Sequence, residues 1–274
     1  MADNKLLEVK DLYVTFNTYS GKVHAVRGVN FEVNSGETLA IVGESGSGKS
    51  VTARAVMGIL AKNANIEHGE VLYKGVDLLK LPEKEMAKYR GDELAMIFQD
   101  PLSSLDPVMR IGKQITEAAV LKKNTTKEQA KDKALRLMKA VGIPEPEVRY
   151  TQFPFQFSGG MRQRIVIATA LACDPELLIC DEPTTALDVT VQAKILELIK
   201  QIQDERNIGV IFITHDLGVV AHLADKVAVM YAGKVVEYGT VYEIYEKPRH
   251  PYTMALLAAM PDLETDSNYE LYTI

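Results

Sequence analysis

Apolar and polar positions alternate in short segments through the first third of the chain, which predicts β-strands joined by tight turns. The apolar segments are residues 6–16, 29–33 and 38–42. A helix is expected over about residues 48–60, and residues 66–99 are again strand-like, apart from a charged stretch near their middle.

The pattern changes to helical spacing between residues 111 and 142, where Lys, Ala and Leu are frequent. This spacing predicts a helical insert. Three nearly continuous apolar segments follow at 177–180, 209–214 and 226–233, with an amphipathic helix at 189–205 between the first two. Strands without alternation are buried on both faces, as in a parallel sheet covered by helices, so the pattern predicts an α/β fold.

Composition narrows the class of protein. The 274 residues are 47% hydrophobic and 25% charged, as in an ordinary globular protein, and the net charge of −6 argues against general affinity for nucleic acid. No segment approaches the roughly 18 apolar residues of a membrane span, and the N-terminus does not resemble a secretory signal. Cys173 and Cys180 lie in apolar segments and are expected to be buried structural thiols, which fits a reducing cytosol.

Residues 43–50, GESGSGKS, match the phosphate-binding pattern G-x-x-x-x-G-K-[ST] between an apolar strand and a predicted helix. All of them are expected to bind nucleotide: Gly43, Glu44, Ser45, Gly46, Ser47, Gly48, Lys49 and Ser50. The glycines let backbone N–H groups face the phosphate oxygens. Lys49 would neutralise the β- and γ-phosphates, and the Ser50 hydroxyl would be a ligand for Mg²⁺.

Two carboxylates follow the apolar segment at 177–180. The C-terminal end of a buried parallel strand is where open α/β sheets bind their ligands. We therefore expect Asp181 to hold Mg²⁺ through water and Glu182 to polarise the attacking water as general base. A pair of acids in a solvated turn is the alternative, and the phosphate loop upstream argues against it.

Two further polar residues end apolar segments in the same way. His215 follows residues 209–214 and is expected to contact the γ-phosphate. Gln99 follows residues 95–98, and its uncharged amide would reach Mg²⁺ or the lytic water. For both His215 and Gln99, the alternative is a structural role without contact to nucleotide.

A second anion site is predicted at Ser158, Gly159 and Gly160, which begin a predicted helix and so present free backbone N–H groups. The chain therefore carries two predicted phosphate-binding segments, residues 43–50 and 158–160, although one such segment is enough to bind a single nucleotide.

Taken in order, these motifs resemble the ATP-binding subunit of an ABC transporter over nearly the whole chain. The resemblance rests on residues 43–50, Gln99, residues 157–161 (FSGGM), 177–182 (LLICDE) and 186–188 (ALD), and His215. Residues 98–112, 157–164 and 250–261 further resemble the branch that imports dipeptides, oligopeptides or nickel.

The resemblance implies an α/β fold with a P-loop NTPase core and a mostly parallel sheet, an N-terminal antiparallel β subdomain and a helical ABC signature subdomain. The implied boundaries are 1–99 and 166–250 for the core with its β subdomain, and 100–165 for the signature subdomain. Residues 251–274 would be a C-terminal extension, which is expected to be truncated.

In the family, two ATPase subunits face each other head to tail, and the signature of one closes over ATP held by the phosphate loop of the other. This would explain the second anion site, because Ser158, Gly159 and Gly160 would bind the partner's ATP. Gln99 would be the switch-loop glutamine, and Asp188 would act between the subunits.

The family also stacks adenine on an aromatic side chain upstream of the phosphate loop. Tyr19 is nearest to that position, and Tyr13 and Phe16 are alternatives.

The implied cofactors are ATP and Mg²⁺. The implied partners are a second ABC ATPase subunit, in a heterodimer or a homodimer, transmembrane permease subunits and, indirectly, an extracytoplasmic solute-binding protein, with no nucleic acid. The chain would lie peripherally on the cytoplasmic face of the membrane. A short permease helix would dock beside the helical insert, where Met109 and Ile111 are either contacts or core residues.

The chain departs from the family pattern at Phe157 and Met161, where Leu and Gln are usual. Met161 lacks an amide, so no polar side-chain contact is expected there. The peptide branch commonly ends in a cysteine-bearing tail that holds an iron–sulfur cluster. The sequence ends at Ile274 without it, so no cluster is expected.

Three alternative functions differ in class. A soluble ABC ATPase acting on nucleic acid or ribosomes would usually carry a coiled coil, zinc-binding cysteines or a second cassette. The second alternative is a phosphate-loop GTPase or kinase; a GTPase would commonly carry Asn-Lys-x-Asp, and the one Asn-Lys pair, at residues 4–5, is followed by two leucines. A scaffold that binds ATP without cleaving it would not need Glu182 and His215.

Overall fold

The chain passes from one compact unit into a second and then returns to the first. A computed structural model describes residues 5–122, 125–185 and 187–259. The first unit comprises residues 1–80 and 211–274, and the second comprises residues 81–210.

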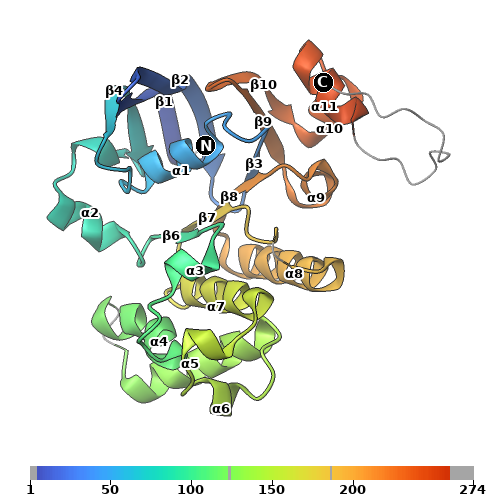
Figure 1. Cartoon of the computed structure of the whole chain (residues 1–274). Helices are drawn as coiled ribbons and strands as arrows, with labels where there is room; N and C mark the ends of the chain where they lie inside the picture. Colours follow the sequence, from blue (N-terminus) through green and yellow to red (C-terminus); the bar gives the residue numbers. More distant parts are fainter. Residues whose placement is uncertain (1–4, 123–124, 186, 260–274) are drawn as a thin grey trace. The chain divides into compact units, whose positions relative to one another are not determined.

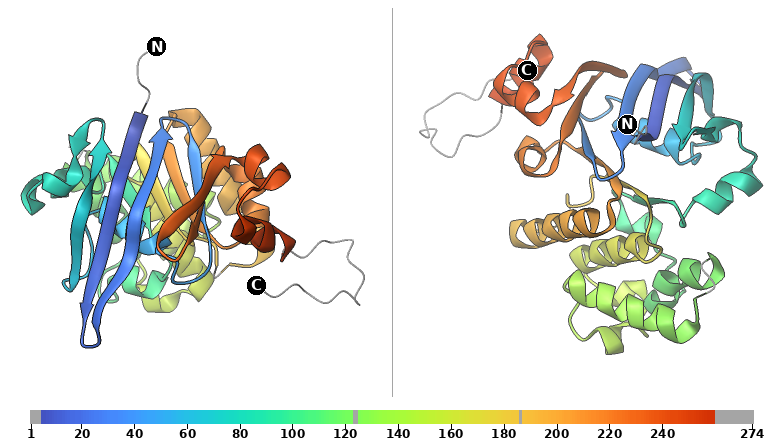
Figure 2. Two further views of the ribbon diagram at one scale, coloured as in Figure 1. Left: turned by 90° about the horizontal axis from the view of Figure 1, so that it is seen from above. Right: turned by 180° about the vertical axis from the view of Figure 1, so that it is seen from behind.

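An antiparallel sheet forms most of the N-terminal part of the first unit. It contains β1 (Lys5–Thr18), β2 (Gly21–Asn34), β4 (Ala64–Tyr73) and β5 (Val76–Asp77), in the order β2-β1-β4-β5. The predicted separate short strands are two long strands, which form the hairpin in Figure 2 and pair up to Thr18 and Gly21 at its tip. Bulges divide this pairing, since the register shifts at several places along the hairpin.

A second sheet in the first unit leads into the phosphate loop. The strands of this sheet that belong to the first unit follow the order β10 (Lys234–Thr240), β9 (Lys226–Tyr231), β3 (Thr38–Val42) and β8 (Gly209–Thr214), and the boundary between the units falls within β8. All residues of β3 and β8 are buried, as their unbroken apolar character predicts. β3 and β9 are parallel, whereas β10 returns antiparallel to β9.

The helices of the first unit cover these sheets. They are α1 (Lys49–Val56), the 3₁₀ turn η1 (Leu78–Lys80), α9 (Leu217–Leu223), α10 (Val241–Glu246) and α11 (Pro251–Ala258). In Figure 1, α1 lies beside β1 and β2. The last three helices share one apolar cluster with β3 and β9, which includes Val42, Val229 and Tyr252.

The second unit is mainly helical. Its parallel strands are β6 (Leu94–Ile97) and β7 (Leu177–Asp181). Its helices are α2 (Glu83–Tyr89), α3 (Pro101–Ser104), α4 (Ile111–Lys122), α5 (Lys127–Ala140), α6 (Pro146–Arg149), the 3₁₀ turn η2 (Pro154–Gln156), α7 (Gly159–Leu171) and α8 (Val189–Arg206).

The helical insert is confirmed by α4 and α5, which pack against α7 (Figure 1). Thr126 and Gln129 form a capping box at the start of α5, since each side chain accepts a backbone N–H of the other. The charged stretch that interrupts residues 66–99 forms α2, whose first turn contains Glu83 and Glu85, favourable at a helix N-terminus.

None of the described helices is long and apolar enough to cross a membrane. Cys173 and Cys180 are buried free thiols, as expected. Burial, together with the charge of the adjacent Asp181, raises the pKa of the Cys180 thiol far above its ordinary value, so this thiol is chemically inert. The tail beyond residue 259 lies outside the described residues.

Candidate functional site

The phosphate loop connects β3 to α1 and is shaped by glycines that no other residue can replace. Gly43 has φ +147°, and a Cβ atom built there would lie 2.1 Å from the carbonyl oxygen of Met230. Gly48 has φ +102°, and its Cβ would lie 2.5 Å from the carbonyl oxygen of Ala25. Both positions therefore combine a left-handed backbone with a close approach of another chain segment.

Lys49 begins α1 and turns its ammonium back over the loop. Its side chain is 5% exposed, and Nζ donates hydrogen bonds to the carbonyl oxygens of Gly43, at 2.7 Å, and Glu44, at 2.8 Å. These bonds satisfy a buried charge and fix its position. The loop thus presents a positioned cation next to the N-terminus of a helix, an arrangement that suits phosphate.

Neighbouring segments hold the loop from outside. The backbone N–H of Gly233, in the turn after β9, donates to the carbonyl of Ser47 at 3.0 Å. The backbone N–H of Glu44 donates to Tyr252 Oη, in α11, at 3.1 Å. The sequence analysis missed Tyr252, because no local pattern connects it with a loop 208 residues earlier.

His215 directly follows β8, at the end of the strand where it was expected. Its side chain is exposed, and Asp216 caps α9 by accepting the backbone N–H of Val219 at 3.3 Å. The helix cap therefore fixes the backbone that carries His215.

The second unit brings together two of the residues expected to be catalytic. Gln99 follows β6, and Glu182 follows β7, the strand paired with it. Gln99 Nε2 donates to Glu182 Oε2 at 2.8 Å, and Thr185 Oγ1 lies 3.3 Å from the same oxygen. An amide and a hydroxyl therefore orient one carboxylate, and the role of Thr185 was not expected from the sequence.

Asp181 and Glu182 lie in contrasting environments. Asp181 is the last residue of β7 and is 1% exposed, whereas Glu182 is partly exposed. Glu182 also has φ +47°, a left-handed conformation that is unfavourable for a residue with a Cβ. Such local strain is typical of functional positions.

The segment after Glu182 is held by a residue that the sequence analysis did not single out. Gln163, on α7, is 1% exposed, and its Nε2 donates to the carbonyl of Pro183 at 2.8 Å. A buried amide among apolar helix positions is the sequence signal that would have found it.

The predicted signature begins α7. Ser158 is the N-cap, and its Oγ accepts the backbone N–H of Met161 at 3.4 Å. Ser158 and Gly159 are exposed, and Gly160 is half-buried. The first turn of α7 therefore reaches the surface with its backbone N–H groups, as an anion site requires. Met161 contributes through its backbone, so the missing amide does not affect this cap.

Asp188 is exposed and caps α8 by accepting the backbone N–H of Val191 at 3.0 Å. Ala186, in the same motif, lies outside the described residues. Burial lowers the pKa of the Arg164 guanidinium, on α7, and the charge of Asp188 partly opposes this shift. Asp188 thus has a structural role in the chain itself.

Tyr19 lies at the tip of the β1–β2 hairpin and is fully exposed. The carbonyl of Ala25 is the group that approaches Gly48 in the phosphate loop. Phe16 pairs with Val23 on the neighbouring strand. Val23 is two residues from Ala25, which is about 7 Å along the strand at roughly 3.3 Å per residue. Tyr19 lies in the turn at the hairpin tip, so Phe16 is nearer to Ala25 along the hairpin than Tyr19 is.

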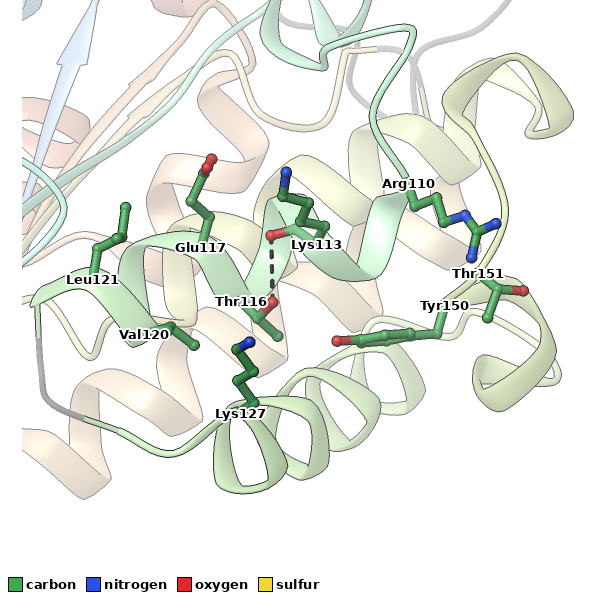
Figure 3. A pocket seen from close by; sticks show the side chains of 9 residues that line it. All are labelled: Arg110, Lys113, Thr116, Glu117, Val120, Leu121, Lys127, Tyr150 and Thr151. Atoms are coloured by element: carbon green, nitrogen blue, oxygen red, sulfur yellow. Dashed lines mark hydrogen bonds between the residues drawn. The ribbon is translucent and has the colours of Figure 1, made fainter.

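A groove in the second unit is separate from these residues (Figure 3). It encloses about 430 Å³ between α4, the start of α5 and the segment after α6, and its lining includes Lys113, Lys127 and Tyr150. The Tyr150 ring lies against Gly112, where a Cβ atom would overlap it. Ile111, considered above as a permease contact, is fully buried and packs in the core instead.

The residues sort into two chemical groups. Those of the first unit, the phosphate loop and His215, have the cationic and N–H groups expected to bind phosphate. Those of the second unit, Gln99, Asp181 and Glu182, have the amide and carboxylate groups expected to supply oxygen ligands and a base. Cleavage of a nucleoside triphosphate requires groups of both kinds.

Comparison with known proteins agrees with this chemistry. Residues 26–185 match the family model for the ABC transporter, and residues 236–274 match that for the oligopeptide/dipeptide transporter C-terminal region. The oligopeptide transport ATP-binding protein OppD of Bacillus subtilis is 60% identical, over 98% of this chain and 76% of its own length. The dipeptide transport ATP-binding protein DppD of Lactococcus lactis is 59% identical, over 97% of this chain and 76% of its own length.

A solved structure shows the same fold. The ATP-binding cassette MJ0796, a dimer in a post-hydrolysis state with ADP and phosphate, superposes with a TM-score of 0.79 at 27% identity. The match covers 86% of this chain and 98% of that one. The predicted P-loop NTPase fold is therefore confirmed, and the chain belongs to the ABC transporter family as one of its ATP-hydrolysing, ATP-binding proteins.

Proposed function

We propose that this chain hydrolyses ATP to drive the import of oligopeptides or dipeptides through a membrane permease, from the cytoplasmic face of the membrane. Two lines support peptide as the solute: the names of the relatives and the match of residues 236–274 to the peptide-transporter C-terminal region. Nickel remains an alternative solute, since the sequence resembles a branch that includes nickel importers.

The observation that carries hydrolysis is the hydrogen bond between Gln99 and Glu182. It holds a carboxylate oxygen in a fixed orientation beside a strand end where nucleotide is expected. Glu182 takes a proton from the attacking water, while Lys49 and His215 stabilise the charge on the β- and γ-phosphates.

The donor set fits Mg²⁺. Ser50, Asp181 and Gln99 offer hydroxyl, carboxylate and amide oxygens, which are the hard ligands that this ion prefers. Asp181 is 1% exposed at the end of β7, and a buried carboxylate is a suitable partner for a cation. When bound, Mg²⁺ would offset the negative charge of the β- and γ-phosphates.

The signature supports a composite site. Ser158, Gly159 and Gly160 present backbone N–H groups at the surface and would bind the γ-phosphate of ATP held by a second ATPase subunit. Asp188 lies on the same unit, and the next residue, Val189, is 83% exposed. An exposed apolar side chain at this place fits a surface that a partner subunit covers.

The general base is tested by Glu182→Gln, which keeps the size of the side chain and removes its basicity. Phosphate release should fall about 10²- to 10⁴-fold, the usual contribution of a general base, while ATP binding persists. Glu197→Gln, which makes the same change at an exposed carboxylate on α8, is the control and should retain the wild-type rate. Unchanged hydrolysis in the Glu182 variant would remove this residue from its role.

The composite site is tested by the dependence of the rate on protein concentration. The rate per chain should rise with concentration if the chain pairs with itself, or on addition of the partner ATPase if it does not. A rate per chain that is the same at every dilution and unaffected by a partner would contradict the proposal.

The solute is tested with the complete transporter in proteoliposomes. Labelled dipeptides and oligopeptides should accumulate only with ATP, and only when the chain carries Glu182. Accumulation of nickel in place of peptides would identify the alternative solute.

The groove in Figure 3 is a suitable docking site for a short permease helix with an acidic side chain. Arg110, Lys113 and Lys127 outnumber Glu117 along it, and the exposed Leu121 adds apolar surface. Lys113→Glu should reduce copurification with the permease, whereas Lys139→Glu, exposed on α5 and outside the groove, should not. Equal copurification of both variants would place the contact elsewhere.

A further inference from the structure

The C-terminal helix α11 touches the phosphate loop through one side chain. Tyr252 Oη accepts the backbone N–H of Glu44 at 3.1 Å. Tyr252 lies in the part of the chain that matches the peptide-transporter C-terminal region, residues 236–274, and outside the part that matches the ABC transporter family, residues 26–185. A segment outside the family-wide ATPase core therefore contacts its nucleotide-binding loop.

Tyr252 is held in place on several sides. It is 8% exposed, its ring lies 4.6 Å from that of Tyr231, and it packs in the same apolar cluster as Val42, the last residue before the loop. The start of α11 is fixed as well, because the Glu237 carboxylate accepts the backbone N–H of His250 at 3.0 Å. Burial raises the pKa of the Tyr252 hydroxyl, so it stays protonated at physiological pH.

The peptide unit between Gly43 and Glu44 is hydrogen-bonded to both Tyr252 and Lys49. The carbonyl of Gly43 and the N–H of Glu44 belong to the same planar group. The carbonyl accepts Lys49 Nζ at 2.7 Å, and the N–H donates to Tyr252 at 3.1 Å. Rotation of this peptide unit would break both bonds, so Tyr252 fixes the plane on which the lysine ammonium rests.

We infer that Tyr252 is a positioning residue for ATP binding, which acts through the Gly43–Glu44 peptide and Lys49. The C-terminal helix thereby sets how well the phosphate loop is organised for nucleotide. The inference depends on Lys49 binding phosphate, as in the proposed function.

The test is Tyr252→Phe in the full chain, which removes the hydroxyl and keeps the ring. Loss of one hydrogen bond should weaken binding of a fluorescent ADP or ATP analogue by about two- to tenfold. In the assembled ATPase, KM for ATP should rise by a similar factor, while kcat changes little, because the hydroxyl does not contact the reacting atoms.

Tyr245→Phe is the matched control. Tyr245 lies in α10, packs against the same apolar cluster, and its hydroxyl donates to the carbonyl of Leu217, away from the loop. This variant also loses a hydrogen bond of a partly buried hydroxyl, so it should lower the melting temperature while nucleotide affinity and KM stay at wild-type values.

Two results would overturn the inference: wild-type affinity and KM in Tyr252→Phe, or equal loss of affinity in both variants. The second result would show that the C-terminal helices act only on stability. Failure of the proposed function is distinguishable, because the wild-type chain itself would then bind no nucleotide in the same assay.

Discussion

The two glycines at positions 43 and 46 offer a direct test of how the phosphate loop is built. Both have positive φ, +147° and +79°, and both precede Lys49 in the same loop. A Cβ at Gly46 meets nothing within 4 Å, whereas one at Gly43 would lie 2.1 Å from the Met230 carbonyl oxygen. Alanine at either position therefore adds backbone strain, but only at Gly43 does it also add a steric overlap.

The magnitudes follow from these two contributions. Gly46→Ala should destabilise the fold by about 1–2 kcal/mol, the cost of a left-handed backbone for a residue with a Cβ. Gly43→Ala carries a similar backbone cost and adds overpacking of about 1–3 kcal/mol, because Met230 lies in a sheet strand that cannot easily move. The Gly43 variant should thus be less stable than the Gly46 variant by at least about 1 kcal/mol.

The assay is reversible urea unfolding of both variants and the wild type without nucleotide, supported by thermal melting. A difference of 1 kcal/mol corresponds to about 2–4 °C for a chain of this size class. Equal midpoints for the two variants would refute the reasoning, since they would show that the contact between Gly43 and Met230 does not constrain the loop.

Two further predictions concern the nucleotide base and the pH dependence of stability. Phe16→Ala and Tyr19→Ala test two of the three aromatic residues considered for stacking on adenine: the variant that lacks the stacking residue should lose ATP affinity by about fivefold or more, and unchanged affinity in both would leave Tyr13. Burial raises the pKa of Glu237, but hydrogen bonding to the Thr253 side chain and to the backbone N–H groups of Arg249 and His250 outweighs burial and holds the pKa below the ordinary value of 4.5. Its folded pKa is depressed, so its stabilisation is complete above about pH 4.5 and is lost as pH falls through the lower folded value. The stability advantage of the wild type over Glu237→Gln, measured by urea unfolding, should therefore be full at pH 7 and shrink as the pH falls below 4.5; an advantage independent of pH would contradict this.

Parts of the structure that depend on local pattern were predictable. β3 is buried throughout and is followed by the glycine-rich loop and α1, and both its apolar character and the loop spacing are visible in residues 38–50. The spacing of apolar residues predicts α4 and α5. Gln99 and Glu182 were each predicted to follow an apolar strand, and the structure shows a hydrogen bond between their side chains.

Other parts depend on contacts between distant segments. In the sequence, Tyr252 is one of several apolar residues of a short helix. Its hydrogen bond to the backbone N–H of Glu44 depends on the fold. The left-handed backbone of Glu182 has no local signal, since Gly, Asn or Asp would be expected at such a φ. The prediction of strands in residues 66–99 left the charged stretch unassigned, and this stretch forms α2. A charged sequence can form a helix when acidic residues lie in its first turn and an ion pair such as Lys88–Glu85 joins successive turns.

The positive φ of Glu182 means that its proposed catalytic role and thermostability make opposite demands on this position. A glycine there would relieve the backbone and raise the melting temperature while removing the proposed base. Directed evolution for heat resistance alone, without a screen for turnover, would therefore tend to remove this carboxylate, and a library designed to stabilise this protein should leave residue 182 fixed.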